Sequence, residues 1–147
     1  MRKVLLIGVR GVGKTTLARA LAGKLGAVHL NGDEYSAVSF DSGRAEVDLL
    51  QQARQLGWIA DQIARARQFV VVDFVCSSEA SRIAFQAGRQ AFVVWVDRVK
   101  VDHASGCGGQ FETPATYNVR VTSPGTVEQW ASRIESAVRR SVGAGFV

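Results

Sequence analysis

The sequence predicts a single α/β domain, with a five-stranded, mostly parallel β-sheet and helices on both of its faces. Short apolar runs alternate with segments of helical periodicity, as in successive strand–helix–strand units. Two of the runs, residues 69–74 and 91–97, are almost continuously apolar, which is typical of fully buried parallel strands. The chain has 147 residues, 47% of them hydrophobic, enough for one domain with its own core.

The first half of the chain is expected to supply two strands and two helices. Val4–Ile7 is the first strand, and the helix over Lys14–Leu25 should end at Gly26, a residue common just past helix ends. Val28–Leu30 is a short second strand. A long helix is expected over residues 46–67, because apolar residues recur there at the spacing of one helical face. These residues are Leu49, Ala53, Leu56, Ala60 and Ile63.

The second half continues the alternation. A strand over residues 69–74 is followed by a short helix over 78–86 and by a second buried strand over 91–97. A last strand is expected over 117–121. Thr126 and Gln129 then have the spacing of a capping box, which opens a final helix. Val127, Trp130, Ile134 and Val138 should share its buried face.

Between the last two strands lies a polar, glycine-rich stretch at about residues 98–113. A loop of this length in a compact domain is usually either functional or disordered. We expect a short lid here that closes over a bound nucleotide, with Arg98 or Lys100 touching its phosphates. The whole chain, residues 1–147, then forms one domain.

Charge and cysteine content narrow the possible partners. The formal net charge is +5, which suits a polyanion such as nucleic acid, although a triphosphate site also needs cations. Cys76 and Cys107 lie far apart without further ligand pairs, so we expect two reduced thiols rather than a zinc site. No apolar run reaches the ~18 residues of a membrane span, and we expect a cytoplasmic location without membrane contact.

The segment from Gly8 to Thr15 matches the complete phosphate-loop consensus G-x-x-x-x-G-K-[ST], between a strand and a helix. Glycines let backbone N–H groups surround phosphates, and the helix N-terminus adds a positive dipole end. We expect Lys14 to contact the β- and γ-phosphates of ATP and Thr15 to ligate Mg²⁺. The expected nucleotide-binding residues are Gly8, Arg10, Gly11, Val12, Gly13, Lys14, Thr15 and Thr16.

Two carboxylates follow predicted strands. Asp33 comes after the second strand and Asp73 ends the third. Because ligands of doubly wound sheets lie at the carboxyl ends of the strands, both should face the phosphate loop. We assign Asp33 as the base that takes the acceptor hydroxyl's proton, and Asp73 as the second Mg²⁺ partner. Asp97, at the end of the next strand, could equally be functional or structural.

The chain resembles the adenylylsulfate kinases, a group of P-loop kinases with a nucleoside-monophosphate-kinase-like fold. The resemblance rests on the phosphate loop, on Leu30-Asn31-Gly32-Asp33, on the Val72–Cys76 strand end, on the long helix, and on the Phe111–Tyr117 segment. It implies transfer of the γ-phosphoryl group of ATP to a hydroxyl group. Arg54 stands at an arginine position of that family and is a candidate substrate contact.

The chain also departs from this family. Tyr35, Ser36 and Ala37 replace an arginine expected after the Gly-Asp pair, and Leu49 follows Asp48 where an arginine is usual. Trimmed relatives resemble bacteriophage kinases that phosphorylate 5-hydroxymethyluracil in DNA, in the host cytoplasm. This resemblance implies a DNA acceptor, with Tyr35 or Phe40 stacking on a flipped base, whereas Phe74 is expected in the core.

Three functions therefore stay open from the sequence. They are a DNA hydroxymethyl kinase, an adenylylsulfate or other small-molecule kinase, and a non-catalytic nucleotide switch.

Overall fold

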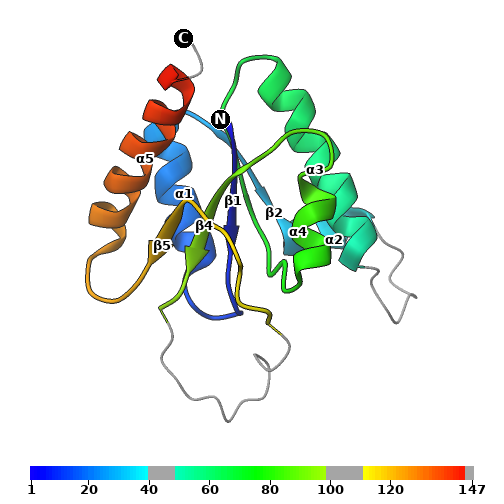
Figure 1. The fold of residues 1–147 in the computed structure, drawn as a ribbon, viewed down its shortest axis with the longest axis horizontal. Helices are drawn as coiled ribbons and strands as arrows, with labels where there is room; N and C mark the ends of the chain where they lie inside the picture. The colour runs from blue at the N-terminus through cyan, green and yellow to red at the C-terminus, as the bar shows by residue number, and fades with distance from the viewer. Residues whose placement is uncertain (40–48, 99–110, 145–147) are drawn as a thin grey trace.

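The computed structural model describes residues 1–39, 49–98 and 111–144. Its five strands form one sheet in the order β2-β3-β1-β4-β5, and every neighbouring pair is parallel (Figure 1). The strands are β1 (Lys3–Ile7), β2 (Val28–Asn31), β3 (Val70–Asp73), β4 (Phe92–Val96) and β5 (Val119–Val121). The predicted fold class is confirmed, and the described sheet is parallel throughout rather than mostly so.

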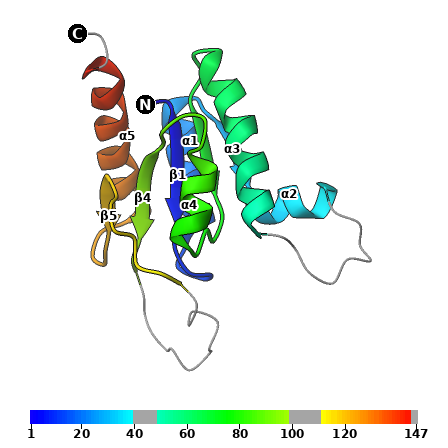
Figure 2. The same cartoon turned by 45° about the vertical axis from the view of Figure 1, so that its right-hand side comes forward.

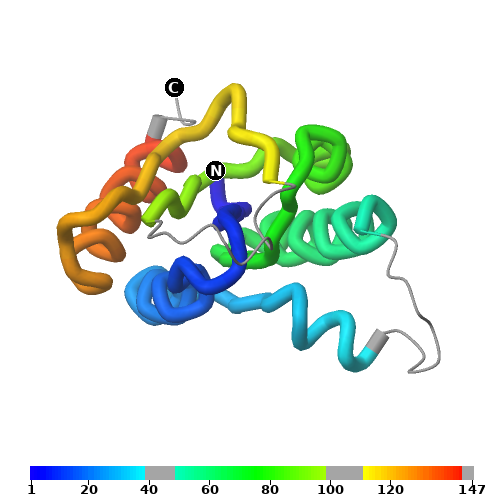
Figure 3. The backbone as a smooth tube through the Cα atoms, turned by 90° about the horizontal axis from the view of Figure 1, so that it is seen from below, coloured from blue at the N-terminus to red at the C-terminus, as the bar shows by residue number. Residues whose placement is uncertain are grey.

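Five helices of the described residues accompany the sheet. They are α1 (Lys14–Leu25), α2 (Gly32–Ser39), α3 (Leu49–Arg65), α4 (Glu79–Phe85) and α5 (Val127–Ala144). Seen along the strands, α1 and α5 cover one face, and α3 and α4 cover the other (Figure 3). Figure 2 shows α2 beside the start of α3.

The central strand β1 shows why two cores form. Its side chains alternate between the faces, as in any strand. Val4 and Leu6 join the core under α1 and α5, whereas Leu5 and Ile7 join the core under α3 and α4. All four are fully buried. An alternating sequence would leave one face polar, so the continuous apolar run of β1 is what a sheet covered on both sides requires.

The predicted elements are present, with shifts of one or two residues at their ends, and the first three residues of the long helix expected over 46–67 lie outside the described residues. Two expectations need correction. Helix α2 is an addition to the predicted elements, because Asn31-Gly32-Asp33 has the sequence pattern of a turn after the second strand. Leu49, expected on the buried face of the long helix, is 56% exposed at the first residue of α3. The rest of that face is correct, since Ala53, Leu56 and Ala60 are fully buried and Ile63 is partly buried against the same core.

A buried ion pair ties the second core to the sheet. Lys3 is 1% exposed, and its Nζ donates to Asp61 Oδ1 of α3 at 2.7 Å. It also donates to the backbone oxygens of Phe85 at 2.7 Å and Arg89 at 2.9 Å. All three ammonium protons therefore have acceptors, which is the condition under which a buried charge is tolerated.

Candidate functional site

The phosphate loop runs from the end of β1 to the start of α1, at the carboxyl edge of the sheet. Gly8 must be a glycine because a Cβ there would lie 2.7 Å from the backbone oxygen of Val96 in β4. Gly13, directly before α1, has φ +91°, a left-handed conformation that costs other residues free energy. The loop can thus turn tightly and direct backbone N–H groups toward an anion at the N-terminus of α1.

Lys14 is the first residue of α1, and its side chain, which reaches back to the loop, is largely buried, with the residue 8% exposed. Its Nζ donates to the backbone oxygens of Gly8 at 2.9 Å and Val9 at 3.0 Å. Burial lowers the pKa of Lys14, and the charge of nearby Asp73 opposes that shift. A bound polyphosphate would add negative charge beside the ammonium group and favour its protonated form.

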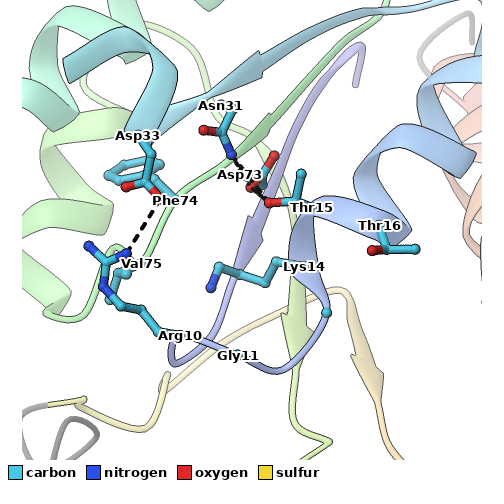
Figure 4. Close-up of a pocket in the computed structure, with 11 residues that line it drawn as sticks. Arg10, Gly11, Lys14, Thr15, Thr16, Asn31, Asp33, Asp73, Phe74 and Val75 are labelled. Carbon is cyan, nitrogen blue, oxygen red and sulfur yellow. Dashed lines mark hydrogen bonds and ion pairs between the residues drawn. The ribbon is translucent and has the colours of Figure 1, made fainter. Parts of the chain in front are cut away.

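A polar network joins α1, β2 and β3 beside Lys14 (Figure 4). The Thr15 hydroxyl donates to Asp73 Oδ1 at 2.9 Å, and Asn31 Nδ2 donates to the same oxygen at 2.9 Å. His29 Nε2 lies 2.5 Å from the other carboxylate oxygen, Asp73 Oδ2. The register of the parallel strands explains the arrangement, because His29 pairs with Val71 and Asn31 pairs with Asp73.

Asn31 also begins helix α2. Its Oδ1 accepts a hydrogen bond from the backbone N–H of Glu34 at 2.9 Å, the geometry of an N-cap. Asp33 and Glu34 lie in the first turn of α2, where their negative charges interact favourably with the positive end of the helix dipole. Gly32 lets α2 start here, since a Cβ on it would lie 2.4 Å from Cβ of Phe74. One amide side chain therefore positions both Asp73 and the helix that carries Asp33.

Asp33 faces the phosphate loop across a cavity. Its Oδ2 lies 3.4 Å from Arg10 Nη1, with side chains 74% and 65% exposed, so the pair contributes little to stability. Asp33 lies in the first turn of α2 and not directly at the end of a strand. Its side chain is therefore separated from Asp73, which ends β3 (Figure 4). Its carboxylate remains available to a ligand.

The cavity has a volume of about 220 Å³ and opens between the phosphate loop, the start of α2 and the end of β3. It is lined by Arg10, Gly11, Gly13, Lys14, Thr15, Thr16, Asn31, Asp33, Asp73, Phe74 and Val75. Phe74 belongs to the core as expected, with its ring centroid 5.9 Å from that of Phe85. Phe74 and Val75 form the apolar side of the cavity, and the phosphate loop with Arg10 and Lys14 forms the charged side.

The donor set fits a magnesium ion. Thr15 Oγ1 and Asp73 Oδ1 lie 2.9 Å apart beside Lys14, and Mg²⁺ prefers such hard oxygen donors. In the part of the chain that the structure describes, no group of three or more His, Cys, Asp or Glu side chains could enclose a metal. An ion held by Thr15 and Asp73 would be completed by phosphate oxygens and water, as is usual for Mg²⁺ in nucleotide sites.

Other predicted residues do not reach this cavity. Arg54 of α3 and Tyr35 of α2 line a separate groove between α2, α3 and α4, where the Tyr35 hydroxyl donates to Gln55 Oε1 at 2.5 Å. Arg98 donates to the backbone oxygen of Gly125. Phe40, Lys100 and most of the expected lid lie outside the described residues.

Asp97 pairs with Arg120 of the neighbouring strand. Its Oδ2 accepts two hydrogen bonds from Arg120 of β5, at 3.0 and 2.7 Å. Of its two possible roles, the pairing with Arg120 favours the structural one.

Sequence reasoning missed Arg82, a buried arginine near the cavity. It donates to the backbone oxygens of Cys76 at 3.0 Å and Glu112 at 2.6 Å. Its guanidinium also lies 4.9 Å from the centre of the Phe111 ring. Arg82 thus holds the segment that follows β3 against the segment that precedes β5. The capping box of α4, from Ser78 to Ser81, was the one local signal near it.

Fold and site together define a P-loop domain with the architecture of the small kinases. A family model described as "AAA domain" matches residues 4–102, and the chain belongs to that family. A 55-residue stretch is 49% identical to the ATP-dependent zinc metalloprotease FtsH of Methylococcus capsulatus. That stretch is 35% of this chain, and the match spans 9% of the protease. No helix among the described residues is long and apolar enough to cross a membrane.

Solved structures agree with this class. The APS kinase of Mycobacterium tuberculosis in complex with AMPPNP and APS superposes with a TM-score of 0.77 at 18% identity, over 94% of this chain and 98% of that one. A sugar kinase from Janibacter sp. HTCC2649 superposes with a TM-score of 0.73 at 17% identity, over 95% of each chain. The fold expected from the resemblance to adenylylsulfate kinases is therefore confirmed.

Proposed function

We propose that the protein is an ATP-dependent kinase that transfers the γ-phosphoryl group of ATP to a hydroxyl group on a small molecule. The proposal rests on one observation: Asp33 and the complete phosphate loop line the same cavity from opposite sides. The oxygen ligands for a cation would suit any nucleotide binder. A mostly exposed carboxylate with only the weak Arg10 contact, across the cavity from the phosphate loop, suits in addition a reaction with an acceptor.

Each side chain then has a defined task. Lys14 and the loop N–H groups bind the phosphates, and Thr15 and Asp73 would hold Mg²⁺, which neutralises charge on the transferring phosphoryl group. Asp33 orients the acceptor hydroxyl and takes its proton. The bond from the γ-phosphorus to the bridging oxygen breaks, ADP leaves with that oxygen, and a new bond forms to the acceptor oxygen.

The size of the cavity favours a compact acceptor. Much of its 220 Å³ would be taken by phosphates near Lys14, leaving the side lined by Asp33, Phe74 and Val75 for the acceptor. The tuberculosis APS kinase is known in complex with APS, so adenylylsulfate is one candidate. Arg54, which matches that family, lines a different groove, and this favours an acceptor other than adenylylsulfate.

A second candidate acceptor is the hydroxymethyl group of 5-hydroxymethyluracil in DNA. Two observations favour it: the net charge of +5 and the absence of arginine at residues 35–37. A polymer acceptor would bring its own phosphates, so its binding should weaken steeply with salt.

The test is transfer of label from γ-labelled ATP to a panel of acceptors. The panel contains adenylylsulfate, sugars and other small alcohols, plain DNA and hydroxymethyluracil DNA, each with wild type and with Asp33→Asn. Labelling of a small alcohol by wild type, lost in Asp33→Asn, would support the main proposal. Labelling of hydroxymethyluracil DNA alone would establish the second candidate. ATP binding without transfer to any acceptor would favour a nucleotide switch and contradict both.

A further inference from the structure

A second polar cavity lies at the end of the sheet opposite the phosphate loop. It is lined by four arginines: Arg2 before β1, Arg65 and Arg67 at the end of α3, and Arg89 before β4. We call these four residues the arginine cluster. In Figure 1 the N-terminus and the last turns of α3 and α5 meet at this end, whereas β1 points toward the phosphate loop at the other.

The positive charge of the cluster is not compensated. Among the residues that the structure describes, no carboxylate lines the cavity, and Lys3, which does line it, already pairs with Asp61. Within those same residues, none of the four arginines forms an ion pair. Arg65 donates to the neutral side chain of Gln62 at 3.2 Å, and the guanidinium of Arg2 lies over the Phe69 ring at 5.0 Å. Four guanidinium groups therefore share one concavity and repel one another.

The backbone at Arg67 is a second, independent observation. Arg67 has φ +66°, in the left-handed region that glycine adopts without penalty and other residues avoid. The position ends the last turn of the helix, since the Arg67 N–H donates to the backbone oxygen of Ala64 at 2.9 Å. Helices commonly end on glycine at such a position. An arginine at a position where glycine would relieve strain points to a use for its side chain.

We propose that the arginine cluster binds the phosphodiester backbone of a nucleic acid. Guanidinium groups match phosphate oxygens in shape and hydrogen bonding, and phosphate contacts provide most of the affinity of such complexes. Several charges along the rim of an open concavity suit an extended polyanion. An anionic membrane fits less well, because none of the large exposed apolar side chains that the structure describes lies at this cavity.

This surface is separate from the proposed phosphotransfer site. The five residues of β1, at about 3.3 Å each, place the two ends of the strand roughly 17 Å apart. The phosphates bound by the cluster therefore lie outside the cavity beside Lys14, since the two cavities share no lining residue. It would hold the kinase near a polymer, whichever acceptor the active site takes.

The test measures fluorescence anisotropy of a labelled oligonucleotide, single-stranded and duplex, at several salt concentrations. We expect the double variant Arg67→Gly/Arg89→Gln to bind at least ~10-fold more weakly at low salt. Its salt slope should fall by roughly 0.7–0.9 for each phosphate that the variant no longer neutralises. The matched control Arg19→Gln/Arg133→Gln removes the same charge from exposed positions of α1 and α5 away from this cavity and should bind like wild type. ATP affinity should be unchanged in both.

Arg67→Gly alone separates binding from folding. Since glycine relieves the left-handed strain, the melting temperature should stay equal or rise while oligonucleotide affinity falls. If oligonucleotide affinity fell equally in the cluster variant and in the control variant, binding would depend only on the net charge of the protein, and the proposal would be overturned. So would binding that disappears in Lys14→Ala, which would place the oligonucleotide at the phosphate loop. Binding to phosphatidylserine vesicles without binding to oligonucleotides would assign the surface to a membrane instead.

Discussion

At the scale of single residues, the site depends on side chains that sit in polar networks rather than alone. Asp73 is held on both carboxylate oxygens, by Thr15 and Asn31 on one side and by His29 on the other. Asp33 has one weak, exposed partner among the described residues, Arg10. Such a contrast fits one carboxylate that must stay in place and another that must change its protonation state during turnover.

Replacing Lys14 by alanine should remove most activity and leave the fold intact. In the proposed mechanism the ammonium group stabilises the charge that develops on the phosphates, and removing such a group typically costs ~10²-fold or more in rate. Because burial lowers the pKa of Lys14, its removal also relieves a desolvated charge, and stability should not fall. Circular dichroism and turnover, measured on the same sample, test this. Turnover near wild type would remove Lys14 from the proposed mechanism.

Asp33→Asn should abolish phosphoryl transfer while ATP still binds. The carboxylate lies on the acceptor side of the cavity, so its removal should affect the chemical step more than donor affinity. Asp73→Asn is the matched comparison, and it should weaken Mg²⁺-dependent ATP binding. Calorimetric titration of each variant, with and without Mg²⁺, distinguishes the two. If Asp33→Asn bound ATP poorly and Asp73→Asn bound it normally, the two assigned roles would have to be exchanged.

The phosphate-loop part of the site could be predicted from the sequence because local spacing alone specifies it. Asp73 could be predicted from its place at the end of an apolar run. Asn31 and His29 could not, because their contact with Asp73 depends on the register between β2 and β3, which no local pattern reveals. The same limit explains Arg54 and Tyr35, because the direction of their side chains depends on how α3 and α2 pack in the fold.

At the scale of elements, the contact between α3 and α4 requires a glycine. Gly57 is buried in the middle of α3, and a Cβ there would lie 2.3 Å from the backbone oxygen of Phe85 at the end of α4. Helix α2 illustrates the opposite case. Its eight residues have few apolar positions, and its start resembles a turn, so helical periodicity could not reveal it. The longer, strongly amphipathic helices could be predicted within a few residues.

Gly57→Ala should therefore lower the free energy of unfolding by about 1–3 kcal/mol, as overpacking in cores commonly does. Gly23→Ala in α1 is the control, since nothing lies within 4 Å of the added Cβ. That change should raise stability by roughly 0.5–1 kcal/mol through helix propensity. Urea unfolding of both variants gives the comparison. Similar effects of the two substitutions would contradict the close approach of α4.

At the scale of the whole molecule, the Lys3–Asp61 pair connects the sheet with the α3–α4 layer. Asp61→Asn should cost about 3–5 kcal/mol of stability, because it leaves a buried ammonium group without its counterion. The double variant Lys3→Met/Asp61→Leu should cost much less, since no charge remains buried. Thermal unfolding of both variants tests this. Equal costs would mean that packing, not charge, governs the position.

The same pair predicts a pH dependence. Burial lowers the pKa of Lys3, and Asp61 opposes that shift, so Asp61→Asn should lower the pKa further. Between the folded and unfolded pKa values the unfolded chain binds more protons, so stability rises with pH in that window. The gap between wild type and Asp61→Asn should therefore narrow at alkaline pH. A gap that widens instead would contradict the assignment.

The strand order has a consequence for synthesis on the ribosome. Strand β1 emerges first, yet it lies between β3 and β4, whose residues begin at Val70 and Phe92. This strand, fully buried in the folded protein, therefore cannot pair with both neighbouring strands until Val96 has left the exit tunnel. Pairings between segments so far apart in the sequence form slowly. During that interval α1 is the nearby element that can cover Val4 and Leu6. Nascent chains that stop before β4 should consequently recruit chaperones, and chains that extend beyond it should release them.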